Sequence, residues 1–390
     1  MNGENIVCFA KDWSEDPTSN NHVMKLLARD NEVLWLNSIA MRTPDFRSGR
    51  DLSKIGRKLA SFMRGPVTVE KRLSVYTPIV LPFPHSRAAV MMNRQILKTT
   101  VSLLRRRQGM RDFQLWTFLP TAVEYVGKLG ESLVVYYCTD EFSQFSYLDG
   151  GKMARMEREL CQRADIVFTT SRTLHEKKRA LNPETHLASH GVDHAHFSTA
   201  MEERTKVAEE IAALPRPILG FFGLIHDWID LDLFAYIAEL RPTWSIVLIG
   251  KAAVDVSKLK KYPNIHLLGR KPYEELPRYC KGFDIGLIPF VLNELTRNVN
   301  PIKLREYLSA GLPVVSTNLP EIGYYSDTCR IATDHAGFLA ACDAALGEDS
   351  LEERRRRSRA MAKETWEAKV MELGEHVKRV KRERSGGRTT

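Results

Sequence analysis

The fold class of this chain is decided by residues 282–317, GFDIGLIPFVLNELTRNVNPIKLREYLSAGLPVVST. Asp284 to Phe290 form a short apolar run, which is typical of a buried strand. A polar loop follows, and apolar residues at helical spacing then predict a helix from Ile302 to Ala310, ended by a glycine. A second strand begins at Pro313. This order of elements predicts a βαβ unit of a parallel sheet and therefore an α/β fold.

Lys303 and Glu306 are the residues of this stretch that carry chemistry. Both lie in the first turns of the predicted helix, after the carboxyl end of a strand, where open parallel sheets bind their ligands. Backbone N–H groups and the positive end of the helix dipole attract phosphate there. A cation for phosphate and a carboxylate for a sugar hydroxyl are the groups that a nucleotide-sugar site needs. The structural alternative is an ordinary buried helix whose lysine reaches solvent.

The segment PIKLREYLSAGLPVVST, residues 301–317, resembles the donor-site signature of GT-B glycosyltransferases. The large retaining family of these enzymes carries two Glu eight residues apart; Glu306 matches the second, which holds the ribose, and Asn298 stands in place of the first. The form Asn-Pro-x-Lys-x-x-Glu-Tyr is closer to transferases of bacterial polysaccharide assembly, including the teichuronic-acid type and the xanthan glucuronosyltransferase. The resemblance implies two Rossmann-like domains facing across a cleft, with a C-terminal helix crossing back to the N-terminal domain.

The composition is that of a folded globular chain. Its 390 residues suffice for two domains, and with 43% hydrophobic and 27% charged residues neither disorder nor a membrane bundle is indicated. No apolar run approaches the roughly 20 residues that span a bilayer, and residues 1–10 show no signal peptide. The six Cys are scattered without a Cys-x-x-Cys pair, which favours a reducing compartment. We therefore expect a cytoplasmic protein.

The net charge of +9 is unevenly placed. Residues 42–72 carry nine Lys or Arg against three Asp or Glu, and residues 352–388 carry thirteen against seven. Apolar side chains are interleaved with the charge in residues 42–72, a mixture that suits an amphipathic segment on an anionic membrane surface. The alternative is a packed helix with a solvated basic face. The first interpretation predicts a peripheral protein on the inner face of the cell membrane.

The predicted strands fall into two runs. The first opens with a buried strand at Ile6–Ala10 but lacks the Gly-x-Gly-x-x-Gly fingerprint of dinucleotide-binding folds, and the second opens at Ile218. The segments ADIVFTTS, SHGVDHAHF and ETWEAKV resemble parts of GT-B enzymes. We therefore predict an N-terminal acceptor-binding domain, a linker, a C-terminal nucleotide-sugar-binding domain and a helix returning to the N-terminal domain, at residues 1–198, 199–216, 217–365 and 366–384.

The resemblance implies that the donor binds in the second domain. Lys303 is the expected ligand of the donor diphosphate, since a fixed ammonium stabilises the leaving group without a metal ion. Glu306 is expected to accept hydrogen bonds from the ribose. Three further residues are expected to bind the donor, and two are possible ligands: Gly223, Arg270 and Asn300, with His226 and Phe290. Phe290 is equally compatible with a place in the core.

No Asp-x-Asp motif stands at a strand end, so we expect no required Mg²⁺ or Mn²⁺ and no other cofactor beside a donor substrate, expected to be a UDP-sugar. The retaining family usually has Arg and Lys after the first strand of the second domain, whereas residues 223–230, GLIHDWID, hold neither. This departure leaves more of the phosphate binding to Lys303. His190, His194 and His196 lie close together, but they lack Cys or carboxylate partners in register, so we expect no metal site there.

Asp140 is the candidate general base, because it follows the strand Val134–Cys138 and a hydroxyl acceptor must lose its proton as it attacks. The segment VYYCTDEF resembles the stretch of the xanthan glucuronosyltransferase that carries its proposed base. Glu141 and Asp12 compete for the role, and a helix cap is the structural alternative. With Asp140 as the base the reaction inverts the anomeric centre; in the retaining family it would bind the acceptor instead. His22, at the start of the first helix, is a possible ligand of acceptor or donor phosphate.

Three classes of function fit these patterns. The favoured one is a metal-independent glycosyltransferase that moves a sugar from a nucleotide-diphosphate donor to a hydroxyl of a lipid-linked saccharide acceptor. A non-hydrolysing nucleotide-sugar epimerase shares the GT-B fold and would turn over its substrate without an acceptor. A nucleic-acid or lipid-surface binding protein is supported by charge alone, and it predicts affinity for DNA that falls steeply with salt. The two-domain pattern and the Glu306 signature favour the transferase, with no nucleic-acid partner.

Overall fold

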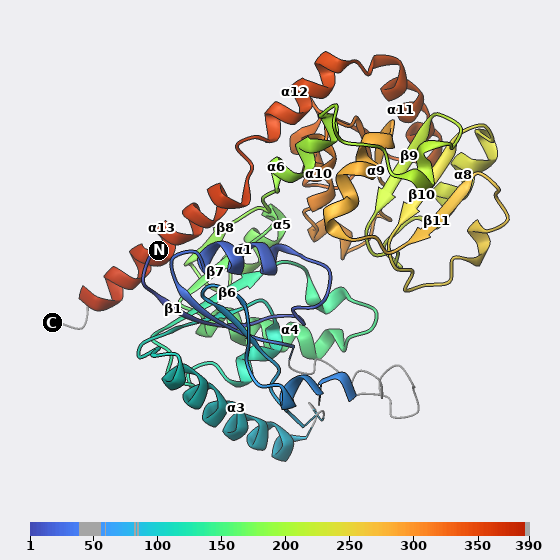
Figure 1. The fold of residues 1–390 in the computed structure, drawn as a ribbon. Helices are drawn as coiled ribbons and strands as arrows, with labels where there is room; N and C mark the ends of the chain where they lie inside the picture. Colours follow the sequence, from blue (N-terminus) through green and yellow to red (C-terminus); the bar gives the residue numbers. More distant parts are fainter. Residues whose placement is uncertain (39–55, 59, 82, 84–85, 387–390) are drawn as a thin grey trace. The chain divides into compact units, whose positions relative to one another are not determined.

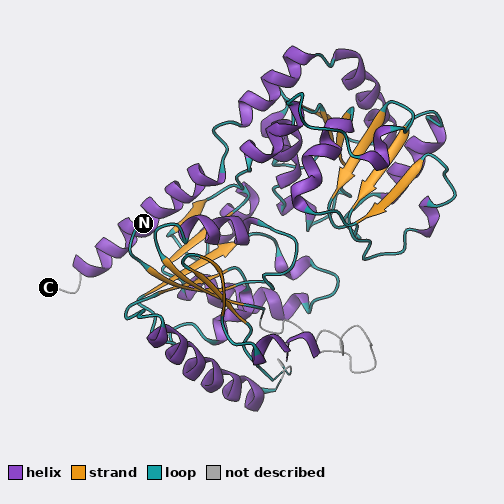
Figure 2. Cartoon of the chain, viewed as in Figure 1, coloured by secondary structure: helices purple, strands orange, loops and turns teal. Residues whose placement is uncertain are grey.

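The structure is a computed structural model that describes residues 1–38, 56–58, 60–81, 83 and 86–386. The chain divides into two compact units, of which the first contains Met1–Ser189 with Lys369–Thr390 and the second contains His190–Ala368. Each unit is a twisted sheet with helices packed around it, so the predicted α/β architecture is confirmed (Figure 1, Figure 2). Among the helices described, none combines the length and the apolar character needed to cross a membrane.

The sheet of the first unit has the strand order β3-β4-β2-β1-β5-β6-β7-β8. All neighbouring strands are parallel except β3 and β4, which pair antiparallel at one edge. The strands are β1 (Asn5–Phe9), β2 (Glu32–Leu36), β3 (Val67–Glu70), β4 (Leu73–Tyr76), β5 (Gln114–Thr117), β6 (Leu133–Cys138), β7 (Ile166–Thr169) and β8 (Thr185–Leu187). Five of them, β1, β2, β5, β6 and β7, are apolar and almost fully buried, which explains why their sequence lacks the alternation of half-exposed strands.

Helices of the first unit begin at polar caps. The side chains of Ser86, Asp149 and Ser171 each accept a hydrogen bond from the backbone N–H three residues ahead. The helices are α1 (Ser19–Leu27), α3 (Arg87–Arg107), α4 (Gly150–Arg163), α5 (Arg172–Arg179) and α13 (Trp366–Gly386), with 3₁₀ turns η1 (Pro120–Glu124) and η2 (Phe142–Gln144). The turn η1 begins at Pro120, whose ring suits the first position of a helical turn.

From Lys369 onward, α13 belongs to the first unit. Ion pairs join it to the N-terminal strands and loops of this unit: Arg379 to Glu184, Lys381 to Glu4 and Arg384 to Asp165. The C-terminal segment forms two helices, α12 (Leu351–Met361) and α13. The break is fixed locally, because the Thr365 hydroxyl accepts a hydrogen bond from the N–H of Ala368.

The second unit holds a fully parallel sheet of order β11-β10-β9-β12-β13-β14. Its strands are β9 (Ile218–Phe222), β10 (Ser245–Ile249), β11 (Ile265–Gly269), β12 (Ile285–Ile288), β13 (Val314–Thr317) and β14 (Cys329–Ala332). Its helices are α6 (His194–Ser198), α7 (Glu209–Ala212), α8 (Leu231–Leu240), α9 (Leu276–Gly282), α10 (Ile302–Ser309), α11 (His335–Glu348) and α12, with 3₁₀ turns η3 (Thr199–Met201), η4 (Ser257–Leu259), η5 (Tyr273–Glu275), η6 (Thr296–Asn298) and η7 (Ile322–Tyr325). The residues expected to form a linker, 199–216, lie inside this unit and include η3 and α7.

The βαβ unit predicted from residues 282–317 is present as β12, α10 and β13. Its place in the sheet matters for function. From β9 the chain adds β10 and β11 on one side and β12 to β14 on the other, so the strand order reverses between β9 and β12. Open α/β sheets bind ligands at such a reversal, outside the carboxyl ends of the strands. This rule directs attention to the ends of β9 and β12.

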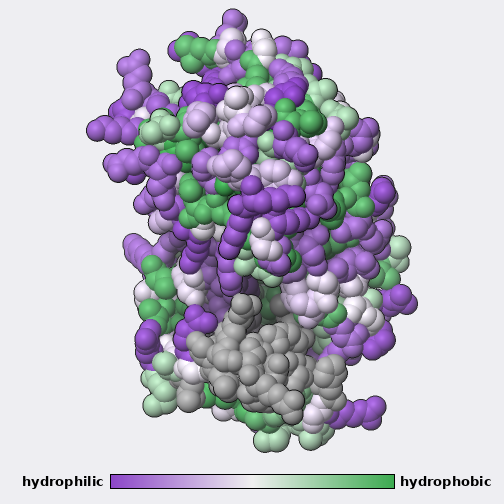
Figure 3. Space-filling model, turned by 90° about the vertical axis from the view of Figure 1, so that its right-hand side faces the viewer, coloured by the Kyte–Doolittle hydropathy of each residue, from purple (hydrophilic) through white to green (hydrophobic). Residues whose placement is uncertain are grey.

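Each unit has its own apolar core, built from the buried faces of its strands and helices. On the face of the molecule drawn in Figure 3, hydrophilic residues predominate and apolar ones are interspersed. Such scattered apolar residues are normal for a protein surface. Polar side chains that are buried or gathered at strand ends are therefore the candidates for a functional site.

Candidate active site

Lys303 lies over the carboxyl end of β9. Its side chain is so close to Gly223 that a Cβ atom on this glycine would lie 2.3 Å from Lys303 Cε and 2.6 Å from Nζ. The ammonium is 5.8 Å from the ring centroid of Phe221. The lysine of α10 thus reaches across to β9 at the point where the strand order reverses.

Two glycines make this approach possible. Gly223 and Gly250, which follow β9 and β10, have φ angles of +140° and +142°, a region that other residues rarely adopt. A Cβ on Gly250 would lie 1.8 Å from the carbonyl oxygen of Gly223, so the two strand ends touch backbone to backbone. A side chain at Gly223 would therefore occupy the space of Lys303, and one at Gly250 would collide with the backbone of Gly223.

Glu306 lies one turn after Lys303 on the same helix and is 9% exposed. Burial raises the pKa of Glu306 to about 7, even though the neighbouring ammonium of Lys303 lowers it. Burial also lowers the pKa of Lys303, with Glu306 acting in the opposite direction. Both groups are therefore held in an environment that disfavours their charged forms, which is characteristic of a binding or catalytic site.

The raised pKa of Glu306 predicts a pH-dependent cost to the stability of the protein. The folded state keeps this proton up to about pH 7, whereas an unfolded chain loses it near pH 4.3, so stability falls as pH rises between these values. The loss amounts to about 3–4 kcal/mol and is complete above pH 7. Glu306→Gln removes it, so the variant should melt above wild type at pH 8 and at the same temperature at pH 5. A difference in melting temperature that does not change with pH would contradict the burial of this carboxylate.

A pocket of about 410 Å³ lies at the ends of β10 and β11 and includes Gly250, whose backbone meets that of Gly223 near Lys303. It is lined mostly by apolar and small residues, with Lys251 and Arg270 at its rim: Ile225, Leu248, Gly250, Lys251, Ala252, Val256, Leu267, Gly269 and Arg270. Its volume falls in the range of small-molecule pockets, roughly 300–1,000 Å³. Of the residues predicted from the sequence to bind the donor, Arg270 is one that lines this pocket.

Asn300 is buried at the entrance to α10, where its side chain is already engaged. Its Oδ1 accepts a hydrogen bond of 2.7 Å from Arg305, and its Nδ2 lies 3.5 Å from Glu321. Arg305, 2% exposed, also donates to the hydroxyl of Tyr325 at 2.6 Å. Asn300 therefore fixes the loop before α10. The role of Arg305 was not predicted from the sequence. Its position on the helix between Lys303 and Glu306 could have suggested a buried polar contact.

The two possible donor ligands differ in their surroundings. Phe290 is 6% exposed and belongs to the apolar core of the second unit, as the structural alternative predicted. His226 lies in the loop after β9, where its ring stacks on Trp228 with centroids 4.2 Å apart and its Nδ1 lies 2.6 Å from Asp227. The loop that lacks Arg and Lys thus presents an ordered histidine.

Asp140 follows β6 in the first unit, half-buried. Burial raises the pKa of Asp140, and the charge of Glu157 raises it further, against a hydrogen bond from Thr139. A carboxylate with a raised pKa is a stronger base, which suits the role proposed from the sequence. The contacts of Glu141 and Asp12, the other two candidates for the base, are compared next with those of Asp140.

Both competitors of Asp140 are held by other side chains. Glu141 is buried; it accepts a hydrogen bond from Ser143 at 2.8 Å and lies 3.5 Å from the ammonium of Lys178. Asp12 accepts hydrogen bonds from the N–H and hydroxyl of Ser38, at 3.0 and 2.8 Å. Asp140 is likewise bonded, to Thr139, and a pKa raised by burial is the property that fits it to the expected role of base.

A buried polar network beneath Asp140 was not predicted from the sequence. Glu157 accepts hydrogen bonds from Tyr136 at 2.6 Å and from Lys178 at 2.7 Å. The sequence held a clue to this network, because Glu157 and Lys178 occupy inward positions of α4 and α5. Their buried neighbours on these helices are Met153, Met156 and Leu160 on α4 and Leu174 on α5. A buried charged pair with full hydrogen bonding orders the segment around it, so this network positions the loop that carries Asp140.

The histidines singled out in the sequence serve structural contacts. His22 is half-buried near the start of α1, after the loop that follows β1. His194 bonds the carbonyl of Ser358 at 3.0 Å and His196 bonds the carbonyl of Tyr273 at 3.0 Å. Within the described ranges, no group of three or more His, Cys, Asp or Glu is arranged to hold a metal ion.

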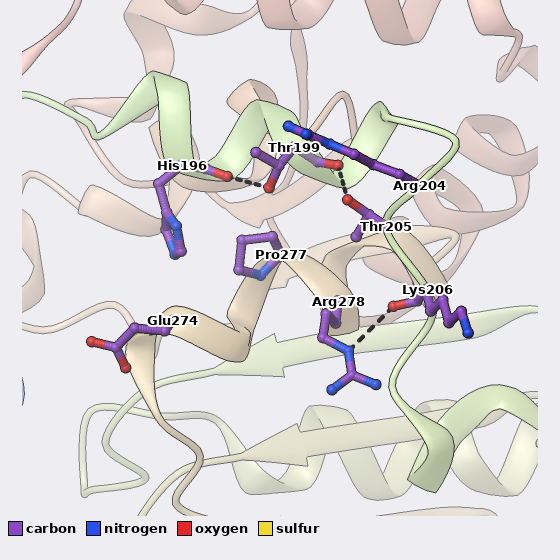
Figure 4. A pocket seen from close by; sticks show the side chains of 8 residues that line it. All are labelled: His196, Thr199, Arg204, Thr205, Lys206, Glu274, Pro277 and Arg278. Atoms are coloured by element: carbon purple, nitrogen blue, oxygen red, sulfur yellow. Dashed lines mark hydrogen bonds between the residues drawn. The ribbon is translucent and has the colours of Figure 1, made fainter.

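A second pocket, of about 370 Å³, lies between the segment after α6 and the start of α9. Figure 4 shows the eight side chains that line it: His196, Thr199, Arg204, Thr205, Lys206, Glu274, Pro277 and Arg278. Its polar groups are largely bonded to one another, as in the contact of Arg278 Nε with the carbonyl of Lys206 at 3.4 Å. It contains no donor-binding residue predicted from the sequence, and its charges are of both signs.

Sequence comparison finds similarity in the second unit. Residues 216–348 match the family described as glycosyl transferases group 1. The Bacillus subtilis protein TuaH, whose name assigns it to teichuronic acid biosynthesis as a glycosyltransferase, is 32% identical over 208 residues. The match spans 50% of this chain and 51% of TuaH, so the chain aligns with about half the length of this relative.

Similar solved structures cover nearly the whole chain. Sucrose-phosphate synthase from Thermosynechococcus elongatus has a TM-score of 0.71 at 14% identity, covering 97% of this chain and 99% of its own. Trehalose 6-phosphate synthase from Burkholderia multivorans has a TM-score of 0.67 at 11% identity, with coverage of 97% and 99%. HepE from Anabaena, solved with UDP, has a TM-score of 0.64 at 12% identity, with coverage of 96% and 99%. The chain therefore has the GT-B fold, and its residues 216–348 match the group 1 glycosyl transferase family.

Proposed function

We propose that this protein is a glycosyltransferase that moves a sugar from a nucleoside diphosphate donor to a hydroxyl of a saccharide acceptor in cell-surface polysaccharide synthesis. The observation that carries the proposal is the half-buried Lys303 with the buried Glu306, at the point where the strand order of the second unit reverses, with an apolar pocket at the neighbouring strand ends. The name of TuaH and the UDP bound to HepE support a nucleotide-sugar substrate and a polysaccharide product.

In this proposal the donor lies along the strand ends. Its diphosphate meets Lys303, its ribose meets Glu306, and its base occupies the pocket rimmed by Arg270. Breaking the glycosidic bond leaves extra negative charge on the diphosphate, and a fixed ammonium in a buried site stabilises that charge more strongly than water does. Lys303 suits this role because its half-buried ammonium is partly shielded from water, which also lowers its pKa.

The transfer is proposed to need no metal ion. The Asp-x-Asp pair of this chain, Asp230 and Asp232, is used for other contacts: Asp230 caps α8 and bonds His335 at 2.9 Å, and Asp232 pairs with Lys258 at 2.7 Å. Lys303 is then the group that stabilises the negative charge on the leaving diphosphate. Transfer that persists in excess EDTA supports this part of the proposal, and transfer restored only by Mg²⁺ or Mn²⁺ opposes it.

Asp140 of the first unit is proposed as the base that accepts the proton of the acceptor hydroxyl, which gives inversion at the anomeric centre. The acceptor is proposed to be lipid-linked, with the protein peripheral to the inner membrane face. Part of the basic segment that suggested this, residues 42–55 and 59, lies outside the described residues. In the part described, Lys58 donates to the carbonyl of Ser38 at 2.7 Å and lies 3.7 Å from Asp12, so this cation is engaged within the protein.

The test of the function is a panel of nucleotide sugars scored by thermal shift and by slow donor hydrolysis. A ligand at 100 times its dissociation constant adds about 2.7 kcal/mol to stability, which is readily measured. At least one UDP- or other nucleotide-sugar is expected to stabilise the protein and to release nucleoside diphosphate. Conversion of the nucleotide sugar to its epimer without acceptor would instead indicate an epimerase.

Gly223→Ala tests the geometry of the donor site. The new methyl group would displace the Lys303 side chain, and alanine at φ +140° adds backbone strain of about 1–3 kcal/mol. We expect a lower melting temperature and at least about a tenfold weaker affinity for nucleoside diphosphate by calorimetry. The matched control is Gly347→Ala, a helical glycine of α11 with nothing within 4 Å of its new Cβ, which should be neutral or stabilising. Unchanged affinity in Gly223→Ala would place the diphosphate elsewhere.

A further inference from the structure

The first unit carries a long stretch of a single charge sign. From Lys71 to Arg111 the sequence contains nine Lys or Arg and no Asp or Glu. Six of these cations are on α3, a helix of 21 residues that lies along the outside of the unit (Figure 1). Solvated helix faces in soluble proteins usually mix both signs, since pairs three or four residues apart stabilise the helix. The absence of acidic residues therefore calls for an anionic partner.

The two faces of α3 are sharply different. Its inward stripe is buried and consists of Ala89, Asn93, Leu97, Val101 and Leu104. The opposite face exposes three large apolar side chains, Met91, Met92 and Leu103, which are 66%, 55% and 50% exposed. Exposed cations alternate with them on this face: Lys98, Arg106 and Arg107. We call these six exposed residues the α3 surface.

The cations of the α3 surface are available to a partner. Arg94, on the flank of the helix, lies 3.8 Å from Glu124, and Arg105 donates to the carbonyls of Met110 and Arg111. By contrast, Lys98, Arg106 and Arg107 make no side-chain ion pair or hydrogen bond with any residue that the structure describes. Their charges are thus directed to solvent.

The loop before α3 extends the apolar part of this surface. The buried side chain of Asn93 bonds both the N–H of Leu81 at 2.6 Å and its carbonyl at 2.9 Å, which pins the loop to the helix. The loop exposes Phe83 and Ile79, at 43% and 37%. Large apolar side chains are therefore presented at the N-terminal half of the helix and in its preceding loop.

We propose that the α3 surface lies on an anionic lipid membrane, with the methionines and Leu103 inserted at the headgroup boundary and the three cations on lipid phosphates. A helix of this length is about 31 Å long, and an amphipathic helix lying in the membrane plane uses both kinds of side chain in this way. The inference rests on the proposed function, because a lipid-linked acceptor would explain why the protein binds a membrane. The observations on α3 that support it do not involve the donor site.

Other occupants fit less well. A nucleic acid or an acidic protein would use the cations, but it gives no reason for exposed Met91 and Met92 on the same face. A second copy of the chain docking through this face would set like charges opposite each other, which is unfavourable. A membrane requires both components, because apolar insertion and headgroup charge act together.

The test is vesicle co-sedimentation of the full chain at low and high salt. Vesicles contain phosphatidylcholine alone or with about 30% phosphatidylglycerol, which makes the surface anionic. Each cation near an anionic surface contributes about fivefold to the partition constant, so Lys98, Arg106 and Arg107 changed together to Glu should weaken binding by at least about a hundredfold. Met91→Gln with Met92→Gln should remove the part of the binding that persists at high salt.

The matched control changes the same amount of charge on the second unit. Arg355, Arg359 and Lys363 are exposed on α12 and just after it, and changing all three to Glu should leave vesicle binding unchanged. Nucleoside diphosphate affinity, measured in every variant, checks folding and separates this inference from the donor site. Wild type that ignores anionic vesicles at low salt, or an α3 variant that binds as well as the control, overturns the proposal. Binding that ignores the methionine changes and is abolished by duplex DNA would assign the surface to nucleic acid instead.

Discussion

Replacing Lys303 with methionine is expected to lower the turnover number for sugar transfer by about 10²–10³-fold, the loss seen when one preorganised group that stabilises developing charge is removed. Methionine keeps the length and apolar stem of the lysine but not its ammonium. Nucleoside diphosphate affinity should fall by about 10- to 150-fold, corresponding to the loss of a charged hydrogen bond of roughly 1.5–3 kcal/mol. Steady-state kinetics and calorimetry with UDP measure the two effects.

The stability of the free Lys303→Met protein separates function from folding. Burial lowers the pKa of Lys303, so the free protein is destabilised by holding this charge, and the variant should melt at or above the wild-type temperature. Lys260→Met, at an exposed position of the same unit, is the matched control and should behave as wild type in every assay. A Lys303→Met enzyme with wild-type turnover would remove the ammonium from the chemistry.

Asp140→Asn is expected to retain donor affinity while losing at least about a hundredfold in transfer rate, the lower end of general-base contributions. Asparagine keeps the shape of the side chain but cannot accept the proton. Since burial raises the pKa of Asp140, the base is active only above that raised value. Wild-type transfer should therefore increase with pH through this ionisation, and the variant should lack that limb of the profile.

Asp12→Asn is the comparison that tests the choice of base. Asp12 accepts two hydrogen bonds from Ser38, and an amide oxygen can accept them as well, so transfer should fall by less than about tenfold. The opposite ranking, with Asp12 essential and Asp140 dispensable, would show that the base is in the loop after β1. Near-normal transfer in both variants would favour a retaining mechanism.

The fold could be predicted from the sequence because its strands are short continuous apolar runs between helical patterns. β12, α10 and β13 follow from residues 282–317 alone. The contacts around the start of α13 could not be predicted in this way, because they join distant parts of the sequence. Thr365 caps α13 and forms a β-bridge with Val192.

Lys303 and Glu306 could be selected from the sequence because they begin a helix after a strand end. Their most informative property could not, because burial of both charges depends on how β9 and β10 meet at Gly223 and Gly250. Asn300 is the opposite case. Its polar side chain suggested a ligand of the donor, but in the structure it accepts a hydrogen bond from Arg305. Sequence position indicates which residues can reach a site, whereas packing determines which are already engaged.

A crystal structure of the chain with bound UDP tests the central claim most directly. The account predicts a diphosphate oxygen within about 3 Å of Lys303 Nζ, ribose hydroxyls on Glu306 and the base in the pocket rimmed by Arg270. Diphosphate bound in the other pocket, beside Arg204 and Arg278, with Lys303 and Glu306 untouched would contradict it.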